Sequence, residues 1–251
     1  MPAVQVIAVE GNVGSGKSEL LHELRRRGYF TVPEPVERWG GTLKRFYENP
    51  ERYSYLFQTR ILACAVGARL DGVAQAKADG HSVIFVERSF LGAHVFVEAS
   101  RLNGHFTSEE LTTYKQLERQ FVQFMPAESQ VAMRVLVTTP VDVCCRRIMD
   151  RDRVGESSGP LMEDYRAKRK YIQQIADLQH RYFVGEGMVV VRGEQAPASI
   201  ADSVLELLRL PRVHVKVRSD STGSSSSSSE GLLSPGSDLG PCPLPVSRSS
   251  S

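Results

Sequence analysis

The amino-acid sequence predicts an α/β fold, in which helices flank a five-stranded parallel β-sheet. Two observations support this prediction. Short runs rich in valine and isoleucine alternate along the chain with longer stretches in which apolar residues recur at helical spacing. The short runs are almost continuously apolar, as strands are when both faces of their sheet are covered. Strands that alternate with helices pair in parallel through right-handed crossovers.

The chain up to residue 86 contains three predicted strands and two predicted helices. Residues 4–9 (VQVIAV) and 82–86 (SVIFV) have the pattern of buried strands, and residues 29–32 form a shorter one. Residues 17–27 place three leucines on one face of a helix. A longer helix over residues 50–77 begins at a proline, which suits a first helical turn, and ends before an Asp-Gly pair.

The chain after residue 86 continues this alternation. A fourth strand over residues 131–137 is stopped by Thr-Thr-Pro, and a fifth covers residues 188–191. Apolar spacing predicts the remaining helices over residues 90–102, 108–124, 141–150, 163–183 and 199–208.

The C-terminal segment has a different composition from the rest of the chain. From residue 219 to residue 251, 14 of 33 residues are serine, and glycine and proline add four each. Such a segment cannot bury enough apolar surface to offset the entropy of ordering it. We therefore expect one folded domain over residues 1–212 and a disordered Ser/Gly/Pro-rich tail over residues 213–251.

The composition also narrows the class of protein. The net charge of +2 gives no reason to expect a nucleic-acid or membrane partner, and no apolar run reaches the 18 residues of a spanning helix. The cysteines have no zinc-site spacing, so we expect free thiols and a reducing compartment, the cytoplasm. They are Cys64, Cys144, Cys145 and Cys242.

A glycine-rich segment of the form G-x-x-x-x-G-K-S joins the first strand to the first helix. Glycines let successive backbone N–H groups turn inward around an anion, and the helix N-terminus adds partial positive charge. The lysine of such a P-loop reaches the β- and γ-phosphates of a nucleoside triphosphate, and the serine hydroxyl can ligate magnesium. The predicted triphosphate site comprises Gly11, Asn12, Val13, Gly14, Ser15, Gly16, Lys17 and Ser18.

Acidic residues follow two of the predicted strands, at the edge where open α/β sheets bind ligands. Glu87 stands beside Arg88 after the third strand, where a carboxylate that organises magnesium is needed. Glu34 follows the second strand, where a carboxylate can accept a proton from an attacking hydroxyl group. This chemistry suits a kinase whose acceptor is an alcohol. For nearby Trp39, core packing and ligand contact are equally supported.

Four arginines gather at the end of the helix predicted over residues 141–150 and in the polar loop after it. Arginines on a closing loop can clamp a transferred phosphoryl group. We expect an Arg-rich lid in which this role is strongest for Arg151 and Arg153, with Arg146 and Arg147 as further candidates.

Four further motifs, combined with the P-loop, resemble the deoxynucleoside kinase family. They are EPVERW, YENPERYSYLFQT, ERS and R-x-R-x-x-E-x-x-x-P-L, and the resemblance runs from about residue 4 to residue 183. It implies the P-loop kinase fold, ATP as phosphate donor together with magnesium, phosphorylation of a deoxynucleoside at its 5′-hydroxyl in nucleotide salvage, and a homodimer packed through helices.

The resemblance also implies roles for single residues. Glu34 matches the general base that activates the 5′-hydroxyl, and Arg88 matches the arginine that orients this base. Gln58 matches the glutamine whose amide pairs with the nucleobase edge, while Phe57 and Phe96 match aromatic residues that pack on the base.

The remaining matches concern the sugar, the metal and the lid. Tyr47 and Glu156 match the pair that holds the 3′-hydroxyl, and Glu87 matches the acid on the magnesium side. Arg151 and Arg153 match the lid arginines. One extra residue in the preceding helix leaves Arg146 and Arg147 as alternatives for a third, with Arg147 the one we assign to ATP binding.

Departures from the deoxycytidine-kinase branch bear on the choice of substrate. Ala65 stands where that branch has an arginine, and either Gly92 or Ala93 stands where it has an aspartate. Without this charged pair the pocket should be roomier. We therefore expect pyrimidine deoxynucleosides, thymidine included, to be favoured, with a broader range left open.

Three other functions fit parts of the sequence. A thymidylate-type nucleoside monophosphate kinase would share the fold, but Glu34 and Gln58 favour an alcohol acceptor. A GTP-binding switch would need an N/T-K-x-D motif, which the sequence lacks. A binding module without activity is disfavoured by the intact Lys17, Glu87 and Arg88.

Overall fold

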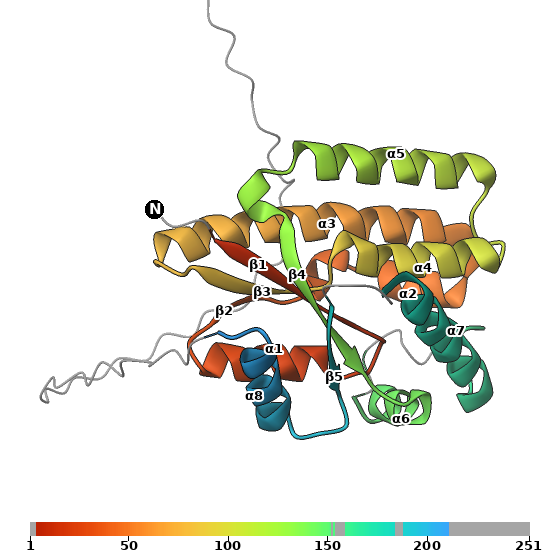
Figure 1. Cartoon of the computed structure of the whole chain (residues 1–251). Coiled ribbons are helices and arrows are strands. Elements are labelled where there is room, and N and C mark those ends of the chain that lie inside the picture. Colours follow the sequence, from red (N-terminus) through yellow and green to blue (C-terminus); the bar gives the residue numbers. More distant parts are fainter. Residues whose placement is uncertain (1–3, 152, 154–158, 184–187, 211–251) are drawn as a thin grey trace, which may run out of the picture. The chain divides into compact units, whose positions relative to one another are not determined.

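The computed structural model describes residues 4–151, 153, 159–183 and 188–210. Five parallel strands form one sheet that is flanked by helices (Figure 1). The described residues contain no helix long and apolar enough to cross a membrane. The domain boundary expected near residue 212 and the tail over residues 213–251 lie outside the described residues and stay predictions.

The sheet confirms the predicted strands, with ends shifted by one or two residues. Its order is β2-β3-β1-β4-β5, and every neighbouring pair is parallel. Because all strands run the same way, their carboxyl ends meet at one edge of the sheet. The strands are β1 (Gln5–Gly11), β2 (Phe30–Val32), β3 (Val83–Glu87), β4 (Val131–Thr138) and β5 (Met188–Arg192).

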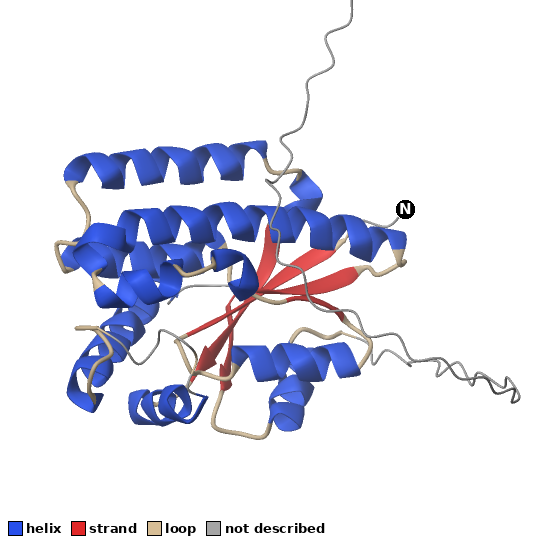
Figure 2. Ribbon diagram, turned by 180° about the vertical axis from the view of Figure 1, so that it is seen from behind, coloured by secondary structure: helices blue, strands red, loops and turns tan. Residues whose placement is uncertain are grey.

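Helices cover both faces of the sheet. Figures 1 and 2 show α1 (Lys17–Arg26) and α8 (Pro197–Leu207) below it, and α3 (Pro50–Ala78) and α4 (Phe90–Leu102) above it. A further helix, α5 (Ser108–Phe124), forms an outer layer over α3 and α4 in Figure 1. The other two predicted helices are α6 (Val141–Arg151) and α7 (Tyr165–Phe183).

One helix of the active-site region was not predicted. The short α2 (Thr42–Glu48) follows the 3₁₀ turn η1 (Val36–Trp39), and a second 3₁₀ turn, η2 (Ala127–Ser129), precedes β4. The two glycines before α2 favour the prediction of a loop from the sequence. The buried positions Leu43, Phe46 and Tyr47 nevertheless have helical spacing. The segment is too short for this periodicity to predict a helix.

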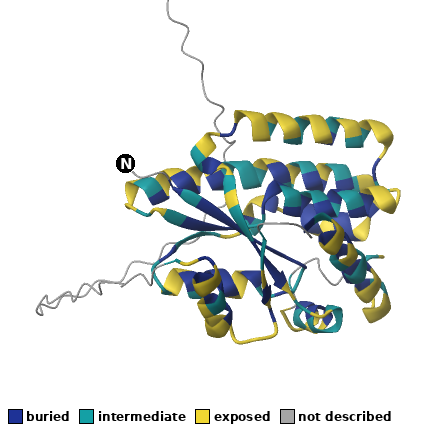
Figure 3. Cartoon of the chain, in the orientation of Figure 1, coloured by how far each residue is buried: buried dark blue, intermediate teal, exposed yellow. Residues whose placement is uncertain are grey.

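The strand β1 shows how the core is divided. Ile7 and Val9 pack toward α1 and α8, while Val6 and Ala8 pack toward α3 on the other face. All four side chains are buried, as Figure 3 shows for the centre of the sheet. The alternation continues to Glu10, a carboxylate with no exposed surface, near the edge where the strands end.

Close packing of α3 on β2 makes a stability prediction. A Cβ atom on Gly72 would lie 2.4 Å from Cγ2 of Val32, whereas one on Gly67, in the same helix, would meet nothing closer than 3.8 Å. We expect Gly72→Ala to lower the free energy of unfolding by about 1–3 kcal/mol through overpacking. Gly67→Ala should raise it by up to about 1 kcal/mol through helix propensity.

Urea unfolding of both variants measures the two effects side by side. The double variant Gly72→Ala with Val32→Ala should recover part of the loss, because the shortened side chain removes the clash. Equal gains in stability at both glycines would contradict the close approach of α3 to β2.

Candidate active site

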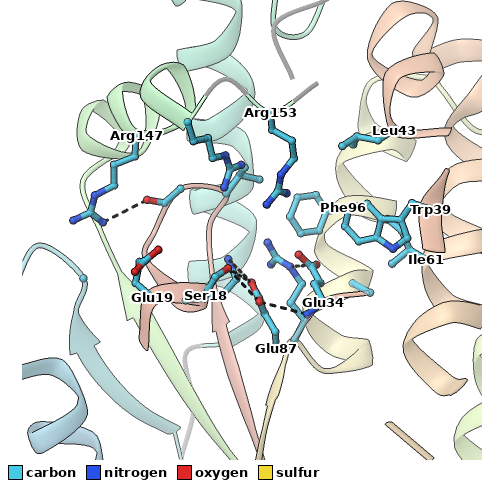
Figure 4. A pocket seen from close by; sticks show the side chains of 18 of the residues that line it. Ser18, Glu19, Glu34, Trp39, Leu43, Ile61, Glu87, Phe96, Arg147 and Arg153 are labelled. Carbon is cyan, nitrogen blue, oxygen red and sulfur yellow. Dashed lines mark hydrogen bonds and ion pairs between the residues drawn. The ribbon is translucent and has the colours of Figure 1, made fainter. Parts of the chain in front are cut away.

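A cavity of about 370 Å³ opens at the edge where the strands end. Most of the predicted site residues line it, although they come from segments far apart in the sequence (Figure 4). They are Val13, Gly14, Gly16, Lys17, Ser18, Glu34, Trp39, Tyr47, Phe57, Gln58, Glu87, Arg88, Phe96, Arg147, Arg151 and Arg153. Gly11, Asn12 and Ser15 belong to the same loop without lining the cavity, and Glu156 lies outside the described residues.

The P-loop needs its glycines for two different reasons. Gly16 precedes α1 with a left-handed backbone conformation (φ 101°), which glycine adopts without strain. Gly14 has φ 75°, and a Cβ atom there would lie 2.6 Å from the carbonyl oxygen of Cys144 in α6. The side-chain amide of Asn12 donates to the carbonyl of Ile172 in α7 at 2.8 Å, so the loop is also anchored to that helix.

The ammonium group of Lys17 lies inside the phosphate-binding loop. Its Nζ donates to the carbonyl oxygen of Asn12 at 2.8 Å and lies 4.0 Å from Oε1 of Glu87. Burial, together with the positive charge of Arg88, lowers the pKa of Lys17 to about 8, while Glu87 acts in the opposite direction. A buried cation of this kind favours a ligand that brings negative charge, as a triphosphate does.

Arg88 connects the ends of three strands. Its Nε donates to Oε1 of Glu34 at 2.7 Å, and its Nη1 donates to the carbonyl oxygen of Gly11 at 2.9 Å. Its backbone N–H donates to the carbonyl of Val9 at 3.0 Å. The residue has φ 67°, an unfavourable value for a side chain with a Cβ, so these contacts hold a strained turn. The Glu34 carboxylate is thereby fixed on the cavity wall.

Two oxygen-bearing side chains lie beside the phosphate-binding loop. The Ser18 hydroxyl lies 3.1 and 3.2 Å from the two carboxylate oxygens of Glu87. The backbone N–H of Glu34 donates to Oε2 of Glu87 at 3.4 Å. Hydroxyl and carboxylate oxygens are the ligands that magnesium prefers, so this pair fits a metal ion shared with bound phosphates. The described ranges contain no group of three or more His, Cys, Asp or Glu side chains placed to hold a metal ion.

The opposite end of the cavity is aromatic. The ring of Phe57 stacks on Phe46 at 5.0 Å between centroids and meets Trp39 edge-on at 5.6 Å. Trp39 is buried in the core and also lines the cavity, so both interpretations of it hold in part. Gln58 is 2% exposed, and no described residue hydrogen-bonds its amide. The guanidinium carbon of Arg88 lies 4.7 Å from the centroid of the Phe96 ring.

The structure distinguishes the two arginines that the sequence left as alternatives. Arg147 lines the cavity, and its Nη1 donates to the carbonyl of Ser15 at 3.2 Å, whereas Arg146 is exposed and does not line it. Figure 4 shows Arg147 and Arg153 on the phosphate side of the cavity. Arg151 lines the same side.

The structure also separates Gly92 from Ala93. A Cβ on Gly92 would lie 2.0 Å from Oε2 of Glu10, so this position packs against a buried carboxylate. Ala93 lines the active-site cavity, and together with Ala65 it lines a small adjoining space of about 30 Å³. A larger side chain at Ala93 would therefore narrow the active-site cavity, whereas one at Ala65 would fill the adjoining space.

Several cavity residues were missed in the sequence analysis. Leu43 and Phe46 belong to the unpredicted α2, and Ile61 lies one helical turn after Gln58. The loop after β5 contributes Gly193 and Gln195, and the first turn of α8 contributes Pro197 and Ile200. The rule that placed Glu34 and Glu87 at strand ends applied to β5 as well, and could have found this loop.

Comparisons with known proteins agree with this geometry. A family model described as deoxynucleoside kinase matches residues 7–195. A probable deoxycytidine kinase of fowlpox virus is 29% identical over 155 residues, 61% of this chain and 63% of that protein. A putative deoxynucleoside kinase of frog virus 3 is 25% identical over 203 residues, 81% of this chain and 93% of its own length. The deoxycytidine kinase of rat is 28% identical over 196 residues, which cover 67% of this chain and 73% of that protein.

The two neighbouring arginines of α6 provide a matched test of the phosphate site. We expect Arg147→Gln to weaken binding of a non-hydrolysable ATP analogue by roughly tenfold or more, because hydrogen bonds to charged groups contribute about 1.5–3 kcal/mol. Arg146→Gln should leave the affinity unchanged, since its side chain is exposed. Titration calorimetry measures both. A larger effect at Arg146 would contradict the assignment of Arg147 to the cavity.

Proposed function

The chain belongs to the deoxynucleoside kinase family, and from this premise we propose that it transfers the γ-phosphoryl group of ATP to the 5′-hydroxyl of pyrimidine deoxynucleosides, thymidine included. One observation above all supports the proposal. The carboxylate of Glu34 is held by Arg88 at 2.7 Å on the cavity wall, between the P-loop and the aromatic end. A base in this place meets an acceptor hydroxyl that approaches from the aromatic end.

Glu34 acts as the general base in this proposal. It accepts the proton of the 5′-hydroxyl as the oxygen attacks the γ-phosphorus, and the hydrogen bond from Arg88 keeps the carboxylate oriented. The neighbouring Gly11 carbonyl fixes the other end of the guanidinium, so the base does not turn away from the cavity.

The charge of the transferred phosphoryl group is balanced by residues on the P-loop side. Lys17 and the backbone N–H groups of the loop bind the phosphates, and Arg147, Arg151 and Arg153 approach from α6 and the segment after it. Positioning and electrostatic stabilisation of this kind supply most of the catalysis in phosphoryl transfer.

The Ser18 hydroxyl and the Glu87 carboxylate would hold magnesium in this proposal. The ion, when bound with ATP, neutralises charge on the phosphate oxygens. The two side chains now bond each other, so ATP–magnesium would take over a contact that already brings their oxygens together. This pairing keeps both groups aimed at the phosphate side of the cavity.

The aromatic end binds the nucleoside in this proposal. The amide of Gln58 offers a donor and an acceptor side by side, as a base edge requires, and Phe57 and Phe96 pack on the base. Tyr47 is assigned to the sugar 3′-hydroxyl with Glu156, which lies outside the described residues. A homodimer packed through helices and a cytoplasmic location remain further expectations.

Substrate range is the finer part of the proposal. Ala65 and Ala93 place no charge beside the base, so nothing at these positions selects the amino group of cytosine. The space they leave suits a base with an added methyl group, as in thymidine. Two of the relatives are named deoxycytidine kinases, so a strict preference for deoxycytidine is the competing outcome.

The general base is tested by its isosteric amide. We expect Glu34→Gln to lower kcat by about 10²–10⁴, because the amide cannot take the proton. The neighbouring carboxylate of Glu37 is exposed, so Glu37→Gln is the matched control and should retain activity. Transfer of label from γ-labelled ATP to thymidine measures the rates. Near-normal kcat in Glu34→Gln, with unchanged folding, would refute the role.

A second experiment ranks the acceptors. We expect both thymidine and deoxycytidine to be phosphorylated, with kcat/KM values within about 200-fold of each other, since a missing or added methyl group changes binding by about 1–3 kcal/mol and no charge at Ala65 or Ala93 selects the amino group of cytosine. Filling the space with Ala93→Leu should reduce activity with thymidine more than with deoxycytidine. Activity with deoxycytidine alone would overturn the predicted range and keep the kinase class. Product only from thymidine monophosphate would shift the assignment to a nucleoside monophosphate kinase.

A further inference from the structure

A second cavity lies outside the active site. It has a volume of about 710 Å³, and its walls come mainly from α3, α4, α5 and β4, with Tyr182 of α7. No residue lines both this cavity and the active-site cavity. Arg69 and Ser89 line it and also line the small space behind Arg88, so the two regions are separated by the turn that carries Arg88.

The walls of this cavity carry an excess of positive charge. The single acidic side chain among the lining residues, Glu118, lies with its Oε2 3.4 Å from Nδ1 of His94. Over the described ranges, Lys115, Arg119 and Arg134 form no ion pair with any carboxylate. The cationic side chains that line the cavity are Arg69, Lys115, Arg119 and Arg134.

Two of these guanidinium groups have buried atoms without partners. Arg69 is 4% exposed, and its Nη2 donates to the carbonyl of Arg88 at 3.2 Å, but its Nε meets no acceptor in the described part of the chain. The Nε of Arg134 is likewise buried and unpaired there. Burial lowers the pKa of Arg69 to about 10, against the attraction of Glu10. A buried cation without a bonded carboxylate is costly unless an anion joins it.

The rest of the wall is apolar. The guanidinium carbon of Arg69 lies 4.4 Å from the centroid of the Phe90 ring, and Leu91, Val122 and Met125 also line the cavity. Free inorganic anions would leave these side chains in contact with water. The combination therefore suits a ligand with one anionic end and one aromatic end.

We propose that this cavity binds a phosphate monoester with an aromatic body. Two or more guanidinium groups match the geometry and double charge of a phosphate better than they match a single carboxylate. Arg69 and Arg134 hold the phosphate from inside, and Arg119 closes on it from α5. Because Arg69 also holds the Arg88 carbonyl, the occupant acts on the turn that orients Glu34 and changes kcat.

Phenyl phosphate is the probe, titrated calorimetrically into the full chain with the active site filled by a non-hydrolysable ATP analogue and a deoxynucleoside. We expect saturable binding that phenol does not reproduce and that inorganic phosphate reproduces at least tenfold more weakly. Absence of saturable binding, displacement of the ATP analogue, or equal affinity for inorganic phosphate would overturn the proposed ligand class.

Variants locate the site. Arg134→Gln and Arg119→Gln should each weaken binding of phenyl phosphate at least tenfold, and Arg119 is exposed, so its variant tests the site even if Arg134→Gln is unstable. Arg25→Gln, an exposed arginine of α1 remote from the cavity walls, is the control and should bind normally. Unchanged binding in Arg119→Gln would overturn the site.

Steady-state rates test the link to Arg88. Saturating phenyl phosphate should change kcat in the wild-type protein without changing KM for ATP, and Arg119→Gln should respond only at tenfold higher concentration. An unchanged kcat at saturation would overturn the coupling. A rise in KM for ATP would place the probe in the active site instead.

Discussion

The contact between Arg88 and Glu34 is the constraint around which the active site is built. Arg88 reaches it only because its backbone adopts φ 67°, and three hydrogen bonds to Val9, Gly11 and Glu34 hold that conformation. A strained turn persists when its surroundings over-determine it. Here the surroundings are the parallel strands β1, β2 and β3. Their carboxyl ends lie at one edge of the sheet, so Arg88, which follows β3, contacts the end of β1 and the residue Glu34 that follows β2.

The same arrangement concentrates charge where water is excluded. Lys17 and Arg88 face the carboxylates of Glu34 and Glu87, while Glu10 is completely buried behind them and accepts from the backbone N–H of Ser89. Burial raises the pKa of the Glu10 carboxyl and lowers that of Lys17. In a low dielectric each of these charges acts strongly on its neighbours. In the proposed reaction the phosphates would therefore meet groups that are already fixed, and little reorganisation would be needed.

The sequence predicted those features that depend on local patterns. The five strands, the P-loop and the acids at strand ends follow from periodicity and from the parallel topology, so Glu34 and Glu87 were found without a structure. Helix α2 was missed because its seven residues are too short for periodicity to outweigh two flanking glycines. The choices between Arg146 and Arg147, and between Gly92 and Ala93, could not be made, since one residue of helix register decides which side chain enters the cavity. Only packing against Ser15 and Glu10 fixes that register.

The shape of the proposed nucleoside end depends on the absence of large or charged side chains at two positions, Ala65 in α3 and Ala93 in α4. Ala65 and Ala93 line a small space next to the active-site cavity, and Arg69, whose Nη2 is directed to the Arg88 carbonyl, lies in the wall of that space. A guanidinium committed to the backbone selects no base edge, so in the proposed function recognition of the base falls to Gln58 and the aromatic rings that line the cavity. Arg69 instead connects the second cavity, which it lines, with the turn at Arg88 that orients the Glu34 carboxylate. Arg69 thus lines both the small space beside the active-site cavity and the cationic cavity that we propose as a second binding site, and the coupling that we propose between them runs through its contact with Arg88.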